Sequence, residues 1–150
     1  MIVDSSALVA ILLAEPGHQV LLDHMARAPI VGVGAPTLAE TGIVLTVRLG
    51  VAGKSLLARL LQEAAAETIA CTAAHWPIAV DAFTRYGKGC HPAALNFGDC
   101  LTYAICQLAG RPLLCIGDDF PQTDLDVVKW SPSVDTVDGD VTPGKPRRLL

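Results

Sequence analysis

Short apolar segments of β-prone residues alternate with segments of helical periodicity along the first 130 residues of this chain. The predicted strands are 1–3, 29–33, 68–71, 112–116 and 126–130. The predicted helices are 5–15, 18–28, 37–49, 53–67, 73–86 and 96–109. Strands that alternate with helices favour a parallel sheet with helices on both faces. We therefore expect an α/β fold with a central parallel sheet of four to five strands.

The composition agrees with one domain and changes only near the C-terminus. The chain has 150 residues, 51% of them hydrophobic and 17% charged, which suits a single core of residues 1–130. From Ser131 onward Ser, Pro, Asp, Gly and Thr dominate, so 131–150 is expected to be a loosely structured tail. No apolar run approaches the roughly 20 residues of a membrane span. We expect a cytoplasmic protein without a membrane partner.

The five cysteines do not indicate a zinc site. They form no C-x-x-C pair, and none has zinc-ligand spacing to the four histidines. Because most of them lie in apolar segments, they are expected to pack as reduced, small hydrophobic residues.

Several acidic residues have a structural explanation when each is taken singly. Asp4 lies between a predicted strand and a predicted helix, where its carboxylate would cap the helix. Glu40 lies three residues after Thr37, and Asp99 three residues after Asn96, which is the spacing of a capping box. The pair Asp118 and Asp119 follows a strand and could simply form a turn.

Taken together, the same acids predict a metal site. Asp4, Glu40 and the pair Asp118 and Asp119 each follow a predicted strand, so they should gather at the carboxyl edge of the sheet. Asp99 begins a helix that could point into the same crevice. Clustered carboxylates repel one another unless a positive charge joins them. A hard divalent cation such as Mg²⁺ accepts oxygen ligands and would supply that charge.

Five segments, in this order and spacing, resemble the PIN-domain family and within it the VapC-type toxins of bacterial toxin–antitoxin pairs. They are residues 2–8, 37–41, 86–100, 113–120 and 123–124. The resemblance implies a parallel sheet with flanking helices and an endoribonuclease that depends on Mg²⁺ or Mn²⁺. It also implies a cognate VapB-type antitoxin that blocks the site, and a homodimer.

The family's acidic positions correspond to Asp4, Glu40 and Asp99 in this chain. The fourth acid is either Asp118 or Asp119, and the Gly-x-Asp-Phe pattern favours Asp119. Ser6 matches a small hydroxyl residue of the family, which could orient a carboxylate or a water. We expect Asp4 and Asp99 to ligate the ion directly, with the other acids acting directly or through water.

The net charge of −4 argues mildly against a nucleic-acid partner. Residues 131–150 hold equal numbers of acids and bases, so the whole charge belongs to residues 1–130. Metal ions would offset part of it. Arg85, Lys88 and His91, around the loop before Asp99, are predicted to contact the RNA backbone, although a solvated polar loop would look the same.

Three other functions share part of this acidic pattern. A phosphatase with an aspartyl nucleophile usually has a second Asp two residues after the first, but position 6 is Ser. A phosphoacceptor receiver domain needs a late Lys in the site, and Lys129 lies inside a predicted strand. The remaining alternative is a catalytically inactive PIN-like module that binds RNA or protein. It is disfavoured because every acidic position is filled.

Overall fold

The computed structural model describes residues 1–131, which contain a four-stranded sheet, six α-helices and one 3-10 helix. The strands are β1 (Ile2–Val3), β2 (Gly32–Gly34), β3 (Glu67–Ile69) and β4 (Leu113–Leu114). The helices are α1 (Ser5–Leu12), α2 (His18–Arg27), α3 (Ala35–Leu49), α4 (Ala52–Glu63), α5 (His75–Tyr86), α6 (Phe97–Ala109) and the 3-10 helix η1 (Phe120–Gln122). The strand order is β3-β2-β1-β4 and every pairing is parallel. The expected α/β fold is confirmed.

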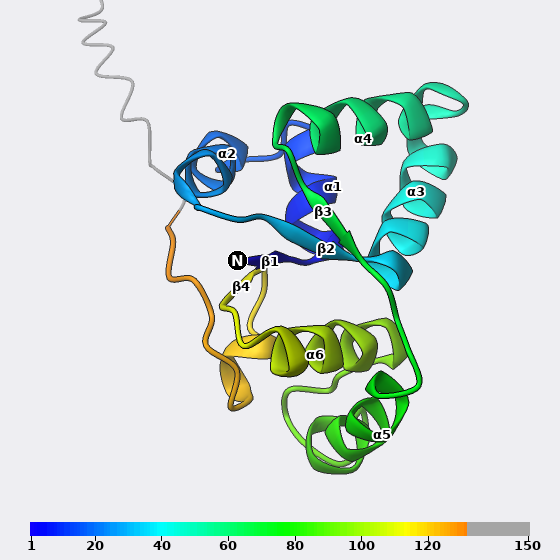
Figure 1. Ribbon diagram of the computed structural model, residues 1–150, viewed down its shortest axis with the longest axis vertical. Coiled ribbons are helices and arrows are strands. Elements are labelled where there is room, and N and C mark those ends of the chain that lie inside the picture. The colour runs from blue at the N-terminus through cyan, green and yellow to red at the C-terminus, as the bar shows by residue number, and fades with distance from the viewer. Residues whose placement is uncertain (132–150) are drawn as a thin grey trace, which may run out of the picture.

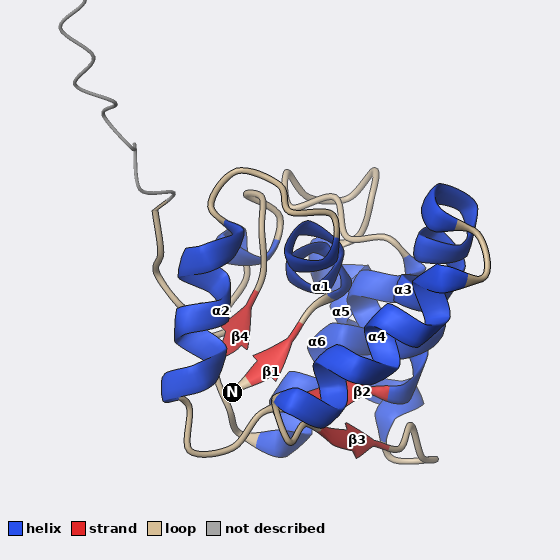
Figure 2. Ribbon diagram, turned by 90° about the horizontal axis from the view of Figure 1, so that it is seen from above, coloured by secondary structure: helices blue, strands red, loops and turns tan. Residues whose placement is uncertain are grey.

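The two faces of the sheet are covered by different helices because side chains alternate along each strand. Ile2 and Leu113 point into a core with α5 and α6. Their chain neighbours Val3 and Leu114 point into a second core built mainly by α1, α2 and α4. Figure 1 shows these helices on opposite sides of the sheet, with α3 beside the sheet, and Figure 2 shows the strands side by side. All four of these strand residues are almost fully buried, as expected for central parallel strands.

The last predicted strand and the end of the predicted helix 53–67 differ from the structure. The last predicted strand, 126–130, contributes only one bridge, between Val127 and Leu113, so the sheet has four strands within the described residues. The predicted helix 53–67 ends at Glu63 instead. Ala65 adopts a left-handed conformation with φ of 45°, which turns the chain into β3. Nothing in the alanine run 64–66 signals this stop.

The start of α3 corrects the interpretation of Thr37 as a helix cap. The helix begins at Ala35, with Pro36 in its first turn, and Gly34 is the N-cap residue. Thr37 is therefore already inside the helix and buried. Glu40 cannot be the second half of a capping box, so its carboxylate is free for another role.

The cysteines behave mainly as packing residues. Cys100, Cys106 and Cys115 are buried and Cys71 and Cys90 are exposed, and none forms a disulfide. Burial raises the pKa of the Cys100 thiol to about 11, which keeps it protonated and unreactive. No helix within residues 1–131 is long and apolar enough to cross a membrane. The prediction of a loose tail concerns residues that, apart from Ser131, lie outside the described part of the chain.

Candidate metal centre and active site

The predicted acids lie at the carboxyl edge of the sheet, where the strand order changes direction. β1 is the first strand of the chain and sits between β2 and β4. Asp4 directly follows β1, and Glu40 lies on the helix after β2. Asp118 and Asp119 lie shortly beyond the end of β4. Ligand sites of open parallel sheets form at this kind of switch point.

Asp4 is fixed in place by hydrogen bonds to both carboxylate oxygens. Oδ2 accepts from the Ser6 backbone N–H at 2.9 Å and from the Ser6 hydroxyl at 2.6 Å. The first of these bonds is the predicted N-cap of α1. The Ser6 hydroxyl in turn accepts from the Ile116 backbone N–H at 3.0 Å. Ser6 therefore connects Asp4 to the segment that leaves β4.

A buried pair of threonines holds the other oxygen of Asp4. Thr102 Oγ1 on α6 donates to Asp4 Oδ1 at 3.4 Å and is hydrogen-bonded to Thr37 Oγ1 on α3 at 3.0 Å. Because a hydroxyl has one proton, Thr37 is the donor in the second bond. This relay joins two helices to the strand-end carboxylate, which is only 4% exposed.

The Glu40 carboxylate lies close to the start of α6 because residue 98 is a glycine with no side chain. A Cβ added at Gly98 would lie 2.8 Å from Glu40 Oε2. Burial, followed by the charges of Asp4 and Asp99, raises the pKa of Glu40, and a bond from Ser5 lowers it in part. Glu40 is therefore close enough to two other acids to interact with their charges.

Asp99 lies in the first turn of α6 and completes the predicted capping box. Asn96 Oδ1 accepts from the Asp99 N–H at 3.1 Å, and Asp99 Oδ2 accepts from the Asn96 N–H at 2.7 Å. Burial raises the pKa of Asp99, the bond from Asn96 opposes that shift, and the charges of Asp4 and Asp119 raise it further. One carboxylate thus has both the structural and the electrostatic role that the sequence suggested separately.

The structure distinguishes the adjacent acids Asp118 and Asp119. Both are exposed. The charge of Asp119 acts on Asp99 and on the buried Cys115. Asp118 instead lines a hollow of about 530 Å³ on the side of Trp130 and Lys129. Asp119 is therefore the one of the two whose charge acts on Asp99.

The acid cluster fits a hard cation that keeps part of its water shell. No three Asp, Glu, His or Cys side chains within residues 1–131 are close enough to hold one ion directly. Asp4 and Asp99 each use one carboxylate oxygen to accept a backbone N–H at a helix cap, and like charges in the cluster repel one another. Mg²⁺ needs only one or two protein carboxylates and fills its remaining positions with water. The all-oxygen donor set and its excess negative charge therefore suit such an ion.

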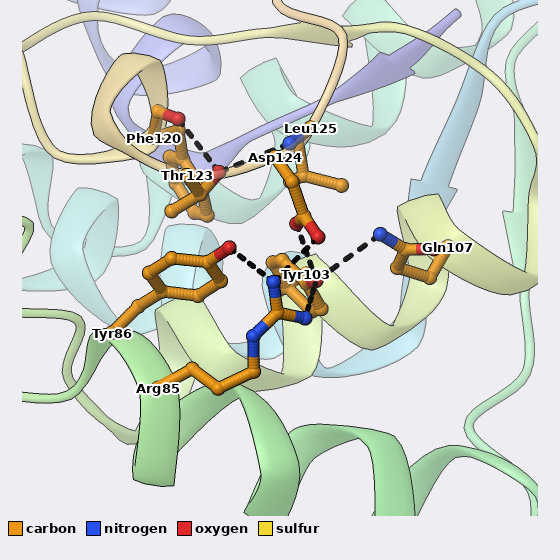
Figure 3. Close-up of polar contacts among 8 residues, drawn as sticks. All are labelled: Arg85, Tyr86, Tyr103, Gln107, Phe120, Thr123, Asp124 and Leu125. Atoms are coloured by element: carbon orange, nitrogen blue, oxygen red, sulfur yellow. Dashed lines mark hydrogen bonds and ion pairs between the residues drawn. The ribbon is translucent and has the colours of Figure 1, made fainter.

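The three predicted RNA-contacting residues differ in their surroundings. Arg85 on α5 donates to Asp124 Oδ2 at 2.8 Å and stacks on the Tyr86 ring (Figure 3). His91 Nδ1 accepts from the Ala93 N–H at 3.1 Å, which stabilises the local turn. Lys88 is exposed, and its ammonium group has no partner within residues 1–131.

Sequence analysis did not identify three residues that shape the site. Thr102 lies three residues after Asp99, on the same face of α6, so helical spacing was a usable signal. Thr37 was interpreted as a cap, and Gly98 gave no signal at all. Their roles depend on how α3 packs against α6, which local sequence does not encode.

Comparisons with known proteins agree with this fold. The family model named PIN domain matches residues 1–125. The VapC ribonuclease Mb2004c of Mycobacterium bovis and ribonuclease VapC36 of Mycobacterium tuberculosis are each 47% identical to this chain over 140 residues. That alignment covers 89% of this chain and 99% of each relative. Ribonuclease VapC of Mycolicibacterium smegmatis is 40% identical over 85% of this chain and 99% of its own length.

Two solved structures share the fold at low sequence identity. Mycobacterium tuberculosis VapC20, described as a toxin that cleaves the sarcin–ricin loop, has a TM-score of 0.71 at 20% identity and covers 85% of this chain and 98% of its own. VapBC2 of Rickettsia felis, bound to a promoter DNA fragment, has a TM-score of 0.70 at 15% identity, with coverage of 87% and 98%. At these identities the likeness concerns the fold.

The chain belongs to the PIN-domain family, as the family match over residues 1–125 and the 47% identity to curated relatives establish. Within that family it is an endoribonuclease of the VapC toxin group, to which relatives 40% to 47% identical to it belong. This outcome favours the nuclease over the inactive binding module.

Proposed function

We propose that this toxin cleaves RNA in the cytoplasm with a divalent cation, Mg²⁺ or Mn²⁺, held at the acid cluster. Asp4 and Asp99 are the proposed direct ligands, and Glu40 and Asp119 act directly or through water. The observation that carries the proposal is the position of the acids: Asp4 follows β1, Glu40 lies on the helix after β2, and Asp99 lies in the first turn of α6, whose Gly98 lies against Glu40. Burial and the charges of neighbouring acids raise the pKa of Glu40 and of Asp99 there. Such repulsion destabilises the metal-free site and is relieved when a cation binds.

The chain's own residues would orient the reacting groups. When bound, the cation polarises the scissile phosphate and lowers the pKa of a water molecule. Ser6 and Thr102 hold Asp4 in one orientation through three hydrogen bonds, which limits the reorganisation needed on binding. Glu40 and Asp99 must be deprotonated to act. Because their pKa values are raised, they lose this form at a higher pH than ordinary carboxyls do.

Chelation of divalent cations tests this function. Cleavage of total RNA should stop when EDTA is added and return with excess Mg²⁺. Lowering the pH should raise the Mg²⁺ concentration needed for half-maximal cleavage, since protonated Glu40 and Asp99 cannot ligate the ion. Cleavage that persists in EDTA would contradict the metal-dependent mechanism. A chain that binds RNA and never cleaves it would instead be the inactive module.

Lys88 and His91 are the proposed contacts to the RNA backbone outside the acid cluster. Lys88 is exposed beside the turn of residues 87–95, which ends directly before α6. An ammonium group there would offset the acidic body locally. Arg85 has partners within the chain, so its contribution to RNA contact is expected to be smaller.

Lys88→Ala should weaken RNA binding about equally for different RNA sequences. Loss of one phosphate contact should also reduce the slope of log affinity against log salt by about 0.7 for single strands. Binding can be measured with the Asp99→Asn variant, in which cleavage is expected to be negligible. Lys54→Ala is the matched control, because Lys54 lies on α4 and lines the groove between α3 and α4. If Lys88→Ala leaves both affinity and salt slope at the control values, the loop does not contact RNA.

A groove between α3 and α4 is the proposed binding site for a VapB-type antitoxin. It has a volume of about 550 Å³. Its lining is apolar apart from one lysine and one threonine, and includes Leu38, Ile43, Val47, Lys54, Leu57 and Leu61. Val47 is 81% exposed and Ile43 is 67% exposed, so burial of both side chains under a partner would be favourable. An amphipathic helix fits such a groove, with an acidic residue near Lys54. The Rickettsia felis neighbour is itself a VapBC2 structure.

The exposed aromatic face of α5 and α6 is the proposed homodimer surface. Trp76 is 63% exposed and Phe97 80%, and they flank a hollow of about 310 Å³ with Val80 and Phe83. The exposure of Trp76 fits packing against a second copy of the chain. Phe97 is two residues from Asp99, so a partner would stand close to the acid cluster.

Two substitutions that introduce a charge test the antitoxin groove and the homodimer surface independently, and each serves as the control for the other. Val47→Asp should weaken antitoxin binding by about tenfold or more, because it buries an unpaired charge in the groove, and should leave the dimer intact. Trp76→Glu should shift the chain toward monomer in sedimentation experiments and leave antitoxin affinity unchanged. Exchanged effects would mean that the two surfaces are wrongly assigned. If neither variant changes assembly, both surfaces are excluded as interfaces.

A further inference from the structure

A hydrogen-bonded cluster joins the loop that carries Asp119 to two helices. Asp124 accepts from Tyr103 OH at Oδ1, at 2.6 Å, and from Arg85 Nη2 at Oδ2, at 2.8 Å. Tyr103 OH also accepts from Gln107 at 3.1 Å and from Arg85 Nη1 at 3.4 Å. Figure 3 shows these side chains converging from α5, α6 and the segment after η1. We call Arg85, Tyr103 and Asp124 the clamp.

The loop between Asp119 and Asp124 is compact, so the position of Asp124 constrains the position of Asp119. Phe120 is buried in the core and 3% exposed. The Thr123 hydroxyl donates to Phe120 O at 2.7 Å and accepts from the Leu125 N–H at 3.2 Å. Gln122 Nε2 donates to Asp118 O at 2.8 Å. These bonds leave few ways for Asp119 to move unless Asp124 moves as well.

The clamp is attached to the same face of the same helix as Asp99. Tyr103 lies four residues after Asp99 on α6, one helical turn away, and is 3% exposed. The helix is rigid over this distance. The bond from Tyr103 to Asp124 therefore fixes the Asp119 loop in the frame of α6, which also holds Asp99.

The clamp acts against the electrostatic repulsion between Asp119 and Asp99. The charges of Asp119 and Asp99 repel each other, which favours movement of the exposed loop away from α6. Burial alone would raise the pKa of Asp124, but the bonds from Tyr103 and Arg85 lower it below its usual range. The negative charge of Asp124 is thus stabilised where it holds the loop. The side chains of Arg85 and Asp124 are 52% and 44% exposed, so this ion pair adds little to global stability.

We propose that the clamp is a positioning device that holds Asp119 against the repulsion of Asp99, and thereby sets the affinity of the acid cluster for its divalent cation. The proposal rests on the proposed metal-dependent function and adds residues that touch neither metal nor RNA. Arg85 is then a positioning residue. Tyr103 and Asp124 are the central pair, because their hydrogen bond joins α6 directly to the segment after η1.

The test measures Mn²⁺ binding to the metal-free chain from the electron paramagnetic resonance signal of free Mn²⁺. Tyr103→Phe removes one hydroxyl and should raise the Mn²⁺ dissociation constant by about tenfold, a usual cost of losing an outer-shell partner. Cleavage should recover at saturating Mg²⁺. Amide hydrogen exchange over 117–125 should become faster. Arg59→Gln breaks the exposed Arg59–Glu63 pair on α4 (2.7 Å) and should change neither measurement.

Repeating the measurement in an Asp119→Asn variant shows whether the clamp acts through Asp119. In an Asp119→Asn chain, Tyr103→Phe should add no further loss of Mn²⁺ affinity. An equal loss in both backgrounds, or none in either, would overturn the proposal. If the unmodified chain binds no Mn²⁺, the metal-dependent function fails, and hydrogen exchange alone decides on the clamp. Faster exchange over 117–125 in Tyr103→Phe would then support the loop attachment, and unchanged exchange would refute it.

Discussion

Asp99→Asn is expected to reduce the rate of RNA cleavage by about 10³-fold, equivalent to about 4 kcal/mol of transition-state stabilisation. The substitution keeps the size of the side chain and an oxygen that can still accept from the Asn96 N–H, so the cap of α6 should survive. It removes a charge that already interacts unfavourably with Asp4 and Asp119. Function should therefore be lost without loss of folding, as at other destabilised active sites.

Cleavage of a defined RNA at fixed Mg²⁺ measures the effect, with thermal unfolding as the check on folding. Asp118→Asn is the matched control, because it removes the same charge from a neighbouring carboxylate that faces another hollow. Its cleavage rate should stay within about twofold of the unmodified chain, as for most surface substitutions. Full activity in Asp99→Asn would exclude Asp99 as a ligand. Loss of activity in Asp118→Asn would transfer the fourth acidic role to Asp118.

Gly53→Ala is expected to lower the free energy of unfolding by about 2 kcal/mol, which corresponds to a fall in Tm of about 6 °C. Gly53 lies in the first turn of α4, against the backbone of α3. An added Cβ would lie 2.6 Å from both the carbonyl carbon and the oxygen of Leu45. Because these are backbone atoms, the two helices must separate. The groove between them should change shape as well.

Gly42→Ala is the matched control for this prediction. Gly42 lies inside α3 on the same groove, but a Cβ there would meet only Leu57 Cδ2, at 3.9 Å. The substitution should raise stability by about 0.5–1 kcal/mol through helix propensity. Thermal and chemical unfolding of both variants measure the difference in sign. If Gly53→Ala is as stable as Gly42→Ala, then α4 does not pack closely on the backbone of α3.

Local patterns predicted what depends on a few neighbouring residues. The N-cap at Asp4 and the capping box of Asn96 and Asp99 are both present, because each bond closes within one helical turn. The same spacing at Thr37 and Glu40 led to a wrong prediction of a capping box, since α3 begins two residues before Thr37. A capping pattern specifies a helix start only where no better start precedes it. Here Gly34 and Pro36 provide one.

The order of apolar segments along the chain determined the parallel sheet, the two covered faces and the edge at which the acids gather. Side-chain alternation in strands and periodicity in helices leave few other ways to bury these residues. Only the tertiary structure decided which of two adjacent acids interacts electrostatically with Asp99. It also decided which threonines are hydrogen-bonded near Asp4, and that Arg85 forms an ion pair with Asp124. Those choices depend on contacts between α3, α5, α6 and the segment after β4. Such contacts join residues far apart in the chain, and no local pattern specifies them.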